Sequence, residues 1–166
     1  MNYIKITKSD IANGFGIRVT LWVSGCSIRC PYCHNKDTWD QNTGRKFDEY
    51  AKKVIYGELQ KPWIDGITLS GGHPLEEYNV TEIYQLCKEI KKYFPDKTIW
   101  LYTGLNFENL MKNDINKRIV ELCDVVVDGP FIQSLKDLKL KWRGSSNQRV
   151  IDVKKTLSKK EIVLYE

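Results

Sequence analysis

The chain has 166 residues, of which 42% are hydrophobic and 28% are charged, a mixture typical of one globular domain spanning residues 1–166. Its net charge of +5 is mild, and apart from a denser basic segment at 136–149 its charges are spread out, so we expect no nucleic-acid partner. No run of roughly 18 apolar residues and no secretory leader are present, which predicts no membrane association and a cytoplasmic location.

Strands and helices are expected to alternate along the chain. The predicted strands, rich in β-branched and aromatic residues, span 16–23, 67–70, 98–103, 125–128, 148–153 and, more weakly, 162–165. The predicted helices, with apolar residues at helical spacing, span 47–59, 79–94 and 107–122. The second helix is expected to begin with a capping box, in which the side chains of Asn79 and Glu82 satisfy free backbone N–H groups.

This alternation predicts an α/β fold built from β-α-β units with a parallel sheet. Crossovers between parallel strands are right-handed, so consecutive strands form either a barrel wall or a doubly wound sheet. Four to six strands are too few for an eight-stranded barrel. We therefore expect a partial, incomplete parallel β/α barrel in a single domain.

Unusual residues follow four of the predicted strands. They are a cysteine cluster after 16–23, Ser70-Gly71-Gly72-His73-Pro74 after 67–70, Thr103-Gly104 after 98–103, and Asp128-Gly129-Pro130 after 125–128. In parallel α/β folds, ligands bind at the carboxyl ends of the strands. The four loops are therefore expected to meet and form one ligand site.

The cysteine cluster has the spacing C-x₃-C-x₂-C at Cys26, Cys30 and Cys33. Cysteine thiolates are the usual ligands of a 4Fe–4S cluster, and three of them leave one iron open to a further ligand. A structural zinc site with His34 as a fourth ligand and a redox dithiol of Cys30 and Cys33 remain as alternatives. The other two cysteines of the chain, Cys87 and Cys123, are expected in the core.

The spacing C-x₃-C-x₂-C with an aromatic residue, Tyr32, before the last cysteine resembles the signature of the radical S-adenosylmethionine superfamily. The resemblance implies that the amino and carboxylate groups of S-adenosylmethionine chelate the open iron. It also implies that an electron from the cluster cleaves this cofactor, and that the resulting 5′-deoxyadenosyl radical abstracts a hydrogen atom.

Further segments resemble the activating enzymes of glycyl-radical enzymes, and they lie at 13–18, 68–72, 33–35, 126–131 and 142–149. The short chain and the segment Gly144-Ser145-Ser146-Asn147-Gln148-Arg149 resemble the activases of anaerobic ribonucleotide reductase in particular. This resemblance implies an anaerobic oxidoreductase that generates a glycyl radical on the large reductase subunit and receives electrons from a flavodoxin-type donor. Activation of another glycyl-radical enzyme, such as pyruvate formate-lyase, and a non-catalytic metal-binding module are the alternatives.

The resemblance also implies which residues bind the cofactor: Tyr32, Ser70, Gly71, Gly72, His73, Thr103 and Asp128. The glycine-rich loop would hydrogen-bond the amino group of S-adenosylmethionine, and Tyr32 would pack against its adenine or against the cluster. Thr103 and Asp128 would face the ribose or a nearby cation, unless they only cap strand ends. Most relatives have an acidic residue where this chain has His73, so His73 either replaces that contact or is an ordinary loop histidine.

Overall fold

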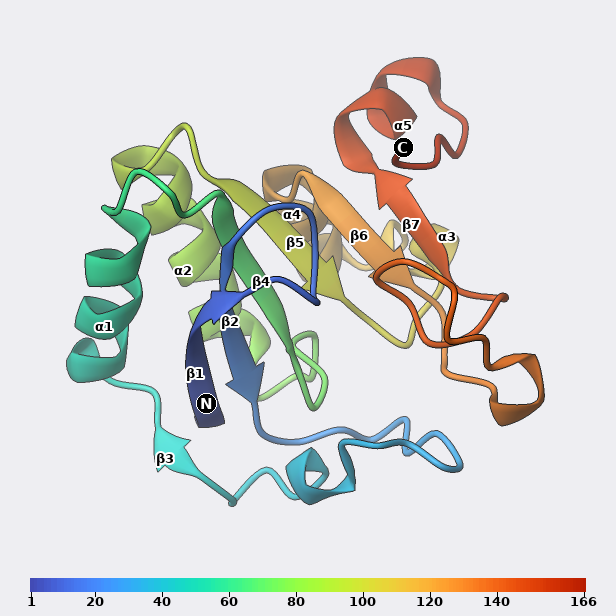
Figure 1. Cartoon of the computed structure of the whole chain (residues 1–166), viewed down its shortest axis with the longest axis horizontal. Coiled ribbons are helices and arrows are strands. Elements are labelled where there is room, and N and C mark those ends of the chain that lie inside the picture. The colour runs from blue at the N-terminus through green and yellow to red at the C-terminus, as the bar shows by residue number, and fades with distance from the viewer.

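The computed structural model describes all 166 residues. Its strands are β1 (Asn2–Asp10), β2 (Arg18–Val23), β3 (Arg45–Lys46), β4 (Gly66–Gly71), β5 (Thr98–Tyr102), β6 (Val125–Asp128) and β7 (Arg149–Asp152). Its α-helices are α1 (Glu49–Leu59), α2 (Val80–Tyr93), α3 (Phe107–Leu110), α4 (Asp114–Leu122) and α5 (Val153–Lys159). All seven strands form one sheet in the order β3-β1-β2-β4-β5-β6-β7 (Figure 1).

The centre of the sheet is parallel, as predicted. Neighbouring strands β2, β4, β5 and β6 all run in the same direction, with Leu21 beside Leu69 and Leu69 beside Leu101. Helices connect β2 to β4, β4 to β5, and β5 to β6, so the α/β class is confirmed. The carboxyl ends of these four strands consequently lie at one edge of the sheet, the lower edge in Figure 1.

Both edges of the sheet differ from the prediction. The sheet is not closed; β1 pairs antiparallel with β2 and with β3, and β7 pairs antiparallel with β6. No α-helix lies between β6 and β7, and without a helical crossover the chain returns antiparallel. An incomplete parallel barrel is therefore not confirmed. The weak strand expected at 162–165 is reduced to a single bridge between Leu164 and Ile151.

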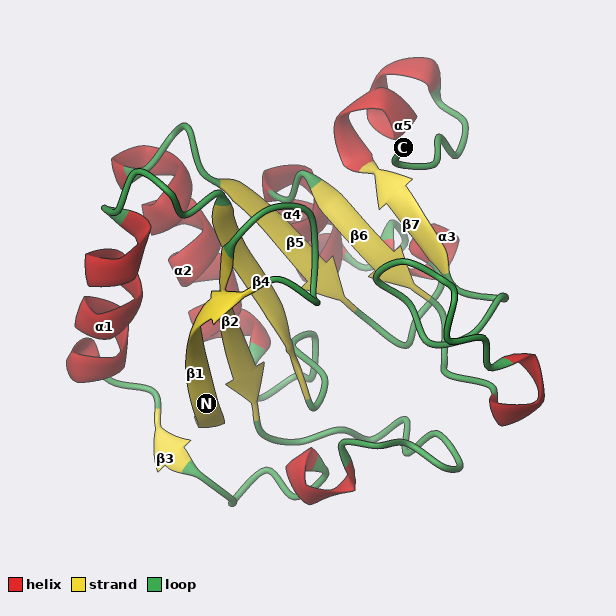
Figure 2. Cartoon of the chain, viewed as in Figure 1, coloured by secondary structure: helices red, strands yellow, loops and turns green.

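The two faces of the sheet are covered differently. Ile99 and Leu101 of β5 belong to the main hydrophobic core, which also contains the buried residues of α1, α2 and α4. Trp100 points to the opposite face and packs edge-on against Trp142 and Tyr165, with both ring centroids 5.1 Å away. Loops rather than helices cross that face (Figure 2).

The main core also contains Cys87 and Cys123, which confirms the prediction that both are core residues. None of the helices is both long and apolar enough to cross a bilayer.

The expected capping box at the start of α2 is wrong. The side chain of Asn79 makes no capping hydrogen bond, because its Nδ2 donates to the carbonyl oxygens of Ser24 and His73, both at 3.1 Å. Glu82 instead binds the N-terminal ammonium at 2.9 Å. Asn79 therefore joins the segments that follow β2 and β4, a tertiary contact that outweighs local capping.

Candidate functional site

A pocket lies at the carboxyl ends of the four parallel strands and is partly open to solvent. All four expected loops contribute to its wall, so the prediction that they meet is confirmed. Of the expected site residues, the pocket is lined by Cys26, Cys30, Cys33, Ser70, Gly71, Gly72, His73 and Thr103.

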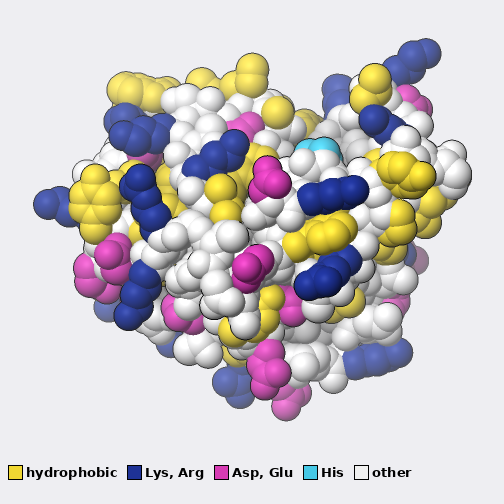
Figure 3. Space-filling view, turned by 90° about the horizontal axis from the view of Figure 1, so that it is seen from below, with side chains coloured by type: hydrophobic (Ala, Val, Ile, Leu, Met, Phe, Trp, Pro, Cys, Tyr) yellow, Lys and Arg dark blue, Asp and Glu magenta, His cyan; other side chains and the backbone are white.

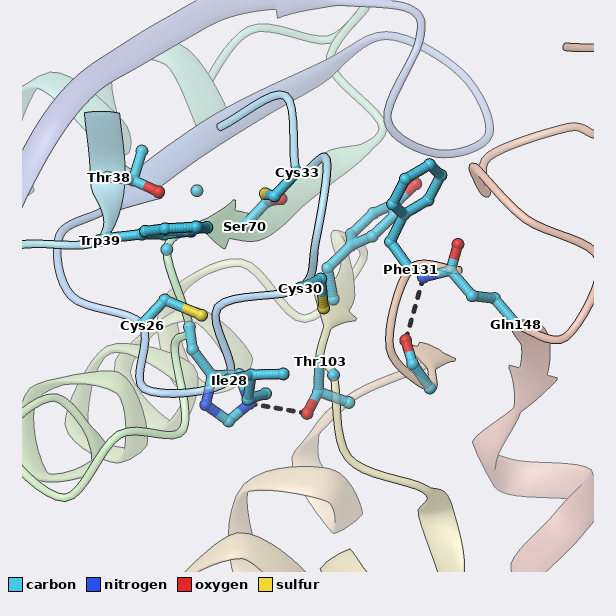
Figure 4. A pocket seen from close by; sticks show the side chains of 16 residues that line it. Cys26, Ile28, Cys30, Cys33, Thr38, Trp39, Ser70, Thr103, Phe131 and Gln148 are labelled. Atoms are coloured by element: carbon cyan, nitrogen blue, oxygen red, sulfur yellow. Dashed lines mark hydrogen bonds between the residues drawn. The ribbon is translucent and has the colours of Figure 1, made fainter. Parts of the chain in front are cut away.

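The three cysteines lie around one part of the pocket, and each is half-buried (Figure 4). Backbone hydrogen bonds hold their loop in place. The Cys26 N–H donates to the carbonyl oxygen of Trp39 at 3.1 Å, and the Cys33 N–H donates to that of Cys30 at 3.1 Å. The Asn35 N–H points at the Cys33 sulfur, 3.4 Å away. Such an N–H stabilises a thiolate, the form of cysteine that binds metal.

The candidate fourth zinc ligand, His34, is not part of the pocket, since its side chain is exposed and lies outside the wall that contains the three cysteines. A zinc site made of three cysteines and His34 is therefore not assembled here, which leaves the three thiols as the candidate ligands. Burial raises the pKa of the Cys26 thiol.

The glycine loop after β4 packs directly against the start of the cysteine loop. The Gly72 N–H donates to the carbonyl oxygen of Val23 at 2.8 Å, and the His73 N–H donates to that of Gly25 at 2.7 Å. A Cβ atom on Gly72 would lie 2.4 Å from the Gly25 oxygen, closer than any stable contact. Gly71 adopts a φ of 104°, which side-chain-bearing residues rarely adopt. This part of the pocket therefore requires both glycines.

His73 is a buried connector between loops, with 4% of its surface exposed. Its Nε2 lies 2.8 Å from the Thr103 hydroxyl, and its Nδ1 lies 3.3 Å from the carboxylate of Glu76. Glu76 also accepts hydrogen bonds from the N–H and hydroxyl of Ser27, at 2.7 and 2.8 Å. These bonds, chiefly the one with His73, lower the pKa of Glu76 to about 2. A continuous chain of contacts thus joins the cysteine loop to the end of β5.

Two of the expected site residues do not line the pocket. Tyr32 is 71% exposed on the cysteine loop. Asp128 is fully buried, and its carboxylate accepts from the Phe107 N–H at 2.7 Å and pairs with Arg149 at 2.5 Å. Asp128 and Glu108 together raise the pKa of Arg149. The roles of Tyr32 and Asp128 toward the cofactor therefore remain predictions.

The pocket also contains residues that sequence reasoning did not assign to it, including Trp39, Phe131 and Gln148. Gln148 donates to the carbonyl oxygen of Gly129 at 3.0 Å and accepts from the Gly144 N–H at 2.9 Å, so it fastens the segment before β7 to the loop after β6. The segment at 144–149, which resembles a known family, could have indicated that Gln148 belongs to the site. Glu76, the partner of His73, was also not expected, and the sequence indicates it only by its position three residues after His73.

Comparison with known proteins identifies the family. A family model described as a 4Fe-4S single cluster domain matches residues 12–151. The anaerobic ribonucleoside-triphosphate reductase-activating protein of Escherichia coli K12 is 45% identical over 152 residues, covering 90% of this chain and 97% of that protein. The chain belongs to this family. Members from phage T4 and Haemophilus influenzae are 41% and 39% identical, covering 90% and 89% of this chain and 93% and 96% of their own.

Membership in this family bears directly on the pocket. The stretch that matches the 4Fe-4S single cluster domain contains all three clustered cysteines and every other residue that lines the pocket. A domain with one cluster needs one set of cysteine ligands, and the only other cysteines, Cys87 and Cys123, are fully buried in the core. The family and the geometry therefore point to the same part of the chain.

Proposed function

We propose that this chain is a radical S-adenosylmethionine activase that generates a glycyl radical on the large subunit of anaerobic ribonucleoside-triphosphate reductase. The observation that carries the proposal is the meeting of Cys26, Cys30 and Cys33 with the glycine loop in one pocket at the strand ends. The names of the relatives, reductase-activating proteins at 39–45% identity, support the reductase as the partner.

The cluster and S-adenosylmethionine, when bound, would supply the electron transfer and the radical chemistry. The protein would hold three irons through its cysteine thiolates and leave the fourth iron free. Ser70, Gly71 and Gly72 would offer backbone and hydroxyl groups to the amino group of the cofactor, since the absence of side chains at the glycines allows a close approach. The walls of the pocket would exclude water from the reacting atoms.

The remaining expected cofactor contacts belong to the same proposal. His73 and Thr103 line the pocket and would position the ribose or the amino group of S-adenosylmethionine. Tyr32, which is exposed on the cysteine loop, would pack over the adenine or the cluster once these are bound. Asp128 would act through Arg149 and the neighbouring Gly129, which does line the pocket.

The open architecture suits a macromolecular substrate. We propose that the sheet serves as an incomplete barrel whose open side admits a glycine-bearing loop of the reductase. Figure 3 views the molecule from the side of the site and shows hydrophobic and basic side chains next to one another on that surface. A flavodoxin-type electron donor and a cytoplasmic location complete the proposal.

The test uses the cluster-loaded protein under strictly anaerobic conditions. With reductant, S-adenosylmethionine and the reductase subunit, we expect methionine, 5′-deoxyadenosine and a glycyl radical signal in electron paramagnetic resonance. Cys30→Ala is the matched inactive control. A radical on pyruvate formate-lyase but not on the reductase would favour the rival activase. A protein that binds metal but never cleaves the cofactor would be a binding module instead.

A further inference from the structure

Residues 132–141, between β6 and β7, form an exposed loop that we call the basic loop. Three of its apolar side chains are exposed: Leu138 at 88%, Leu135 at 41% and Ile132 at 38%. One exposed leucine is ordinary in a folded protein, but several exposed apolar side chains within ten residues are typical of a contact surface.

Hydrogen bonds to the returning chain hold the basic loop in a defined shape. The Ser146 N–H donates to the carbonyl oxygen of Leu135 at 2.9 Å. The Asp137 N–H donates to that of Gly144 at 3.2 Å, and Gln133–Leu135 forms a short 3₁₀ turn. A loop that is ordered before binding loses little conformational entropy when a partner docks, so its exposed apolar groups are ready for contact.

The charge of the basic loop indicates what kind of surface it fits. It has three exposed lysines, at positions 136, 139 and 141, against one aspartate, a net charge of +2. None of these lysines forms an ion pair within the chain, whereas Lys61 and Lys91 each bind a carboxylate at 2.6 Å. Unpaired cations beside exposed leucines complement a partner surface that is acidic and partly apolar.

The basic loop lies next to the pocket. Phe131, directly before the loop, and Gln148, shortly after it, both line the pocket. Figure 1 shows the loop in orange at the lower right, beyond the carboxyl end of β6. A macromolecule that brings one of its residues into the pocket would therefore lie beside this loop.

We propose that the basic loop is the docking element for the large reductase subunit, with Leu138 entering an apolar depression on that subunit and the three lysines facing carboxylates around it. The inference rests on the proposed function, because that function requires a glycine of the reductase to reach the pocket. Buried apolar contacts supply most of the affinity of an interface. Charges around them set the orientation of the partners and the rate of association.

The direct test measures the affinity of the cluster-loaded protein for the reductase subunit of the same organism, by anaerobic biolayer interferometry. We expect Leu138→Ser to weaken binding about tenfold, as for the loss of a central interface side chain. The double variant Lys139→Glu and Lys141→Glu should also weaken it about tenfold and make the affinity less dependent on salt. Both variants should cleave S-adenosylmethionine like the wild type when the reductase is absent, because these residues do not line the pocket.

Matched controls exist far from the basic loop. Ile11 is 76% exposed and follows β1 near the amino end of β2, so Ile11→Ser makes a comparable change at the opposite edge of the sheet. Lys53 is exposed in α1 and has no ion-pair partner, so Lys53→Glu is the control for charge reversal. Neither control should change the affinity for the reductase.

A second measurement leaves the chain intact. In wild-type protein, adding the reductase subunit should slow amide hydrogen exchange in residues 132–141, and exchange in α1 should not change. This measurement decides the matter if a variant fails to fold, because protection of the basic loop in the wild type is sufficient, and its absence would overturn the proposal.

The outcomes separate this inference from the proposed function. Unchanged affinity in both loop variants, or an equal loss in the two controls, would overturn the docking role and leave the activase proposal standing. Loop variants that bind the reductase normally but no longer bind anionic phosphatidylserine vesicles would assign the loop to a membrane surface and would also overturn it. Wild-type protein that forms a radical only on pyruvate formate-lyase would contradict the proposed partner and the docking role together. Failure of the wild type to cleave S-adenosylmethionine would contradict the proposed function itself.

Discussion

The Nε2 atom of His73 lies 2.8 Å from the hydroxyl oxygen of Thr103, and this contact joins the loops that follow β4 and β5. A carboxylate can only accept, so the Nδ1 of His73 donates to Glu76. The Thr103 oxygen also accepts from the Leu105 N–H at 3.1 Å. Thr103 therefore contacts both the His73 ring and the backbone that follows β5.

A carboxylate at position 73 should preserve or strengthen cofactor binding. In His73→Glu the carboxylate would pair with the ammonium of S-adenosylmethionine, so we expect this variant to bind at least as well as the wild type. His73→Ala should lose little affinity, because the backbone of Gly71 and Gly72 would still contact the cofactor.

Calorimetric or fluorescence titration with S-adenosylmethionine measures the affinity of the wild type and the two variants. His34→Ala is the control, because His34 is exposed, lies outside the pocket, and is the only other histidine. Weaker binding by His73→Glu than by His73→Ala would mean that residue 73 does not lie near the ammonium of the cofactor.

Glu76 should stabilise the fold at neutral pH and lose this effect in acid. Its pKa of about 2 lies below the unfolded value near 4.5, so the ionised form is favoured by folding. This stabilisation is complete above about pH 5 and disappears as the pH falls toward 2. Glu76→Gln should therefore lower the free energy of unfolding at pH 7 by roughly 1–2 kcal/mol, as for the loss of a charged hydrogen bond.

Urea unfolding of the cluster-free protein at pH 7 and near pH 4 measures the difference for Glu76. The neighbouring Glu77 is exposed, so Glu77→Gln should change stability by less than about 0.5 kcal/mol. A destabilisation by Glu76→Gln that stays constant, or grows, as the pH falls would contradict a role for the charge.

Gly72→Ala should disturb the cluster site, because its Cβ would meet backbone atoms that cannot move freely, the carbonyl oxygens of Gly25 at 2.4 Å and Thr38 at 3.0 Å. We expect lower cluster retention and weaker cofactor binding in this variant.

Gly57→Ala is the control, a glycine-to-alanine change at a position with room for the side chain. It lies in α1 with open space around its added Cβ, and alanine there should stabilise the helix by roughly 0.5–1 kcal/mol. Full cluster retention by Gly72→Ala would contradict this account, because it would show that the cluster site does not need the close contact between the glycine loop and the cysteine loop.

The parallel centre of the sheet was predictable because its strands carry strong local signals. Leu69 and Val126, for example, lie in short β-branched runs that end in glycine, and the helices between them have clear apolar periodicity. The edges were not predictable in the same way. β1 mixes lysines with partly exposed residues, so it lacks a regular alternation, and its pairing depends on β2. The antiparallel direction of β7 depends on the path of residues 129–148.

The position of the site was predictable from the sequence, but many of the contacts within the site were not. Residues at or directly after strand ends, such as Gly71 and Thr103, were found because strand ends meet at one edge. Partners that depend on tertiary packing were not found. Glu76 reaches Ser27 across 49 positions of the chain, and Asn79 binds backbone oxygens in place of capping α2. Periodicity and spacing contain no information on such long-range contacts.

The central claim is that Cys26, Cys30 and Cys33 hold a four-iron cluster, and iron analysis of the five single cysteine-to-alanine variants tests it most directly. After anaerobic reconstitution, we expect about four irons per chain in the wild type, in Cys87→Ala and in Cys123→Ala. Any one of the three pocket variants should lose the cluster. A wild-type protein that holds one zinc ion and no iron, or a cluster that survives Cys30→Ala, would contradict the account.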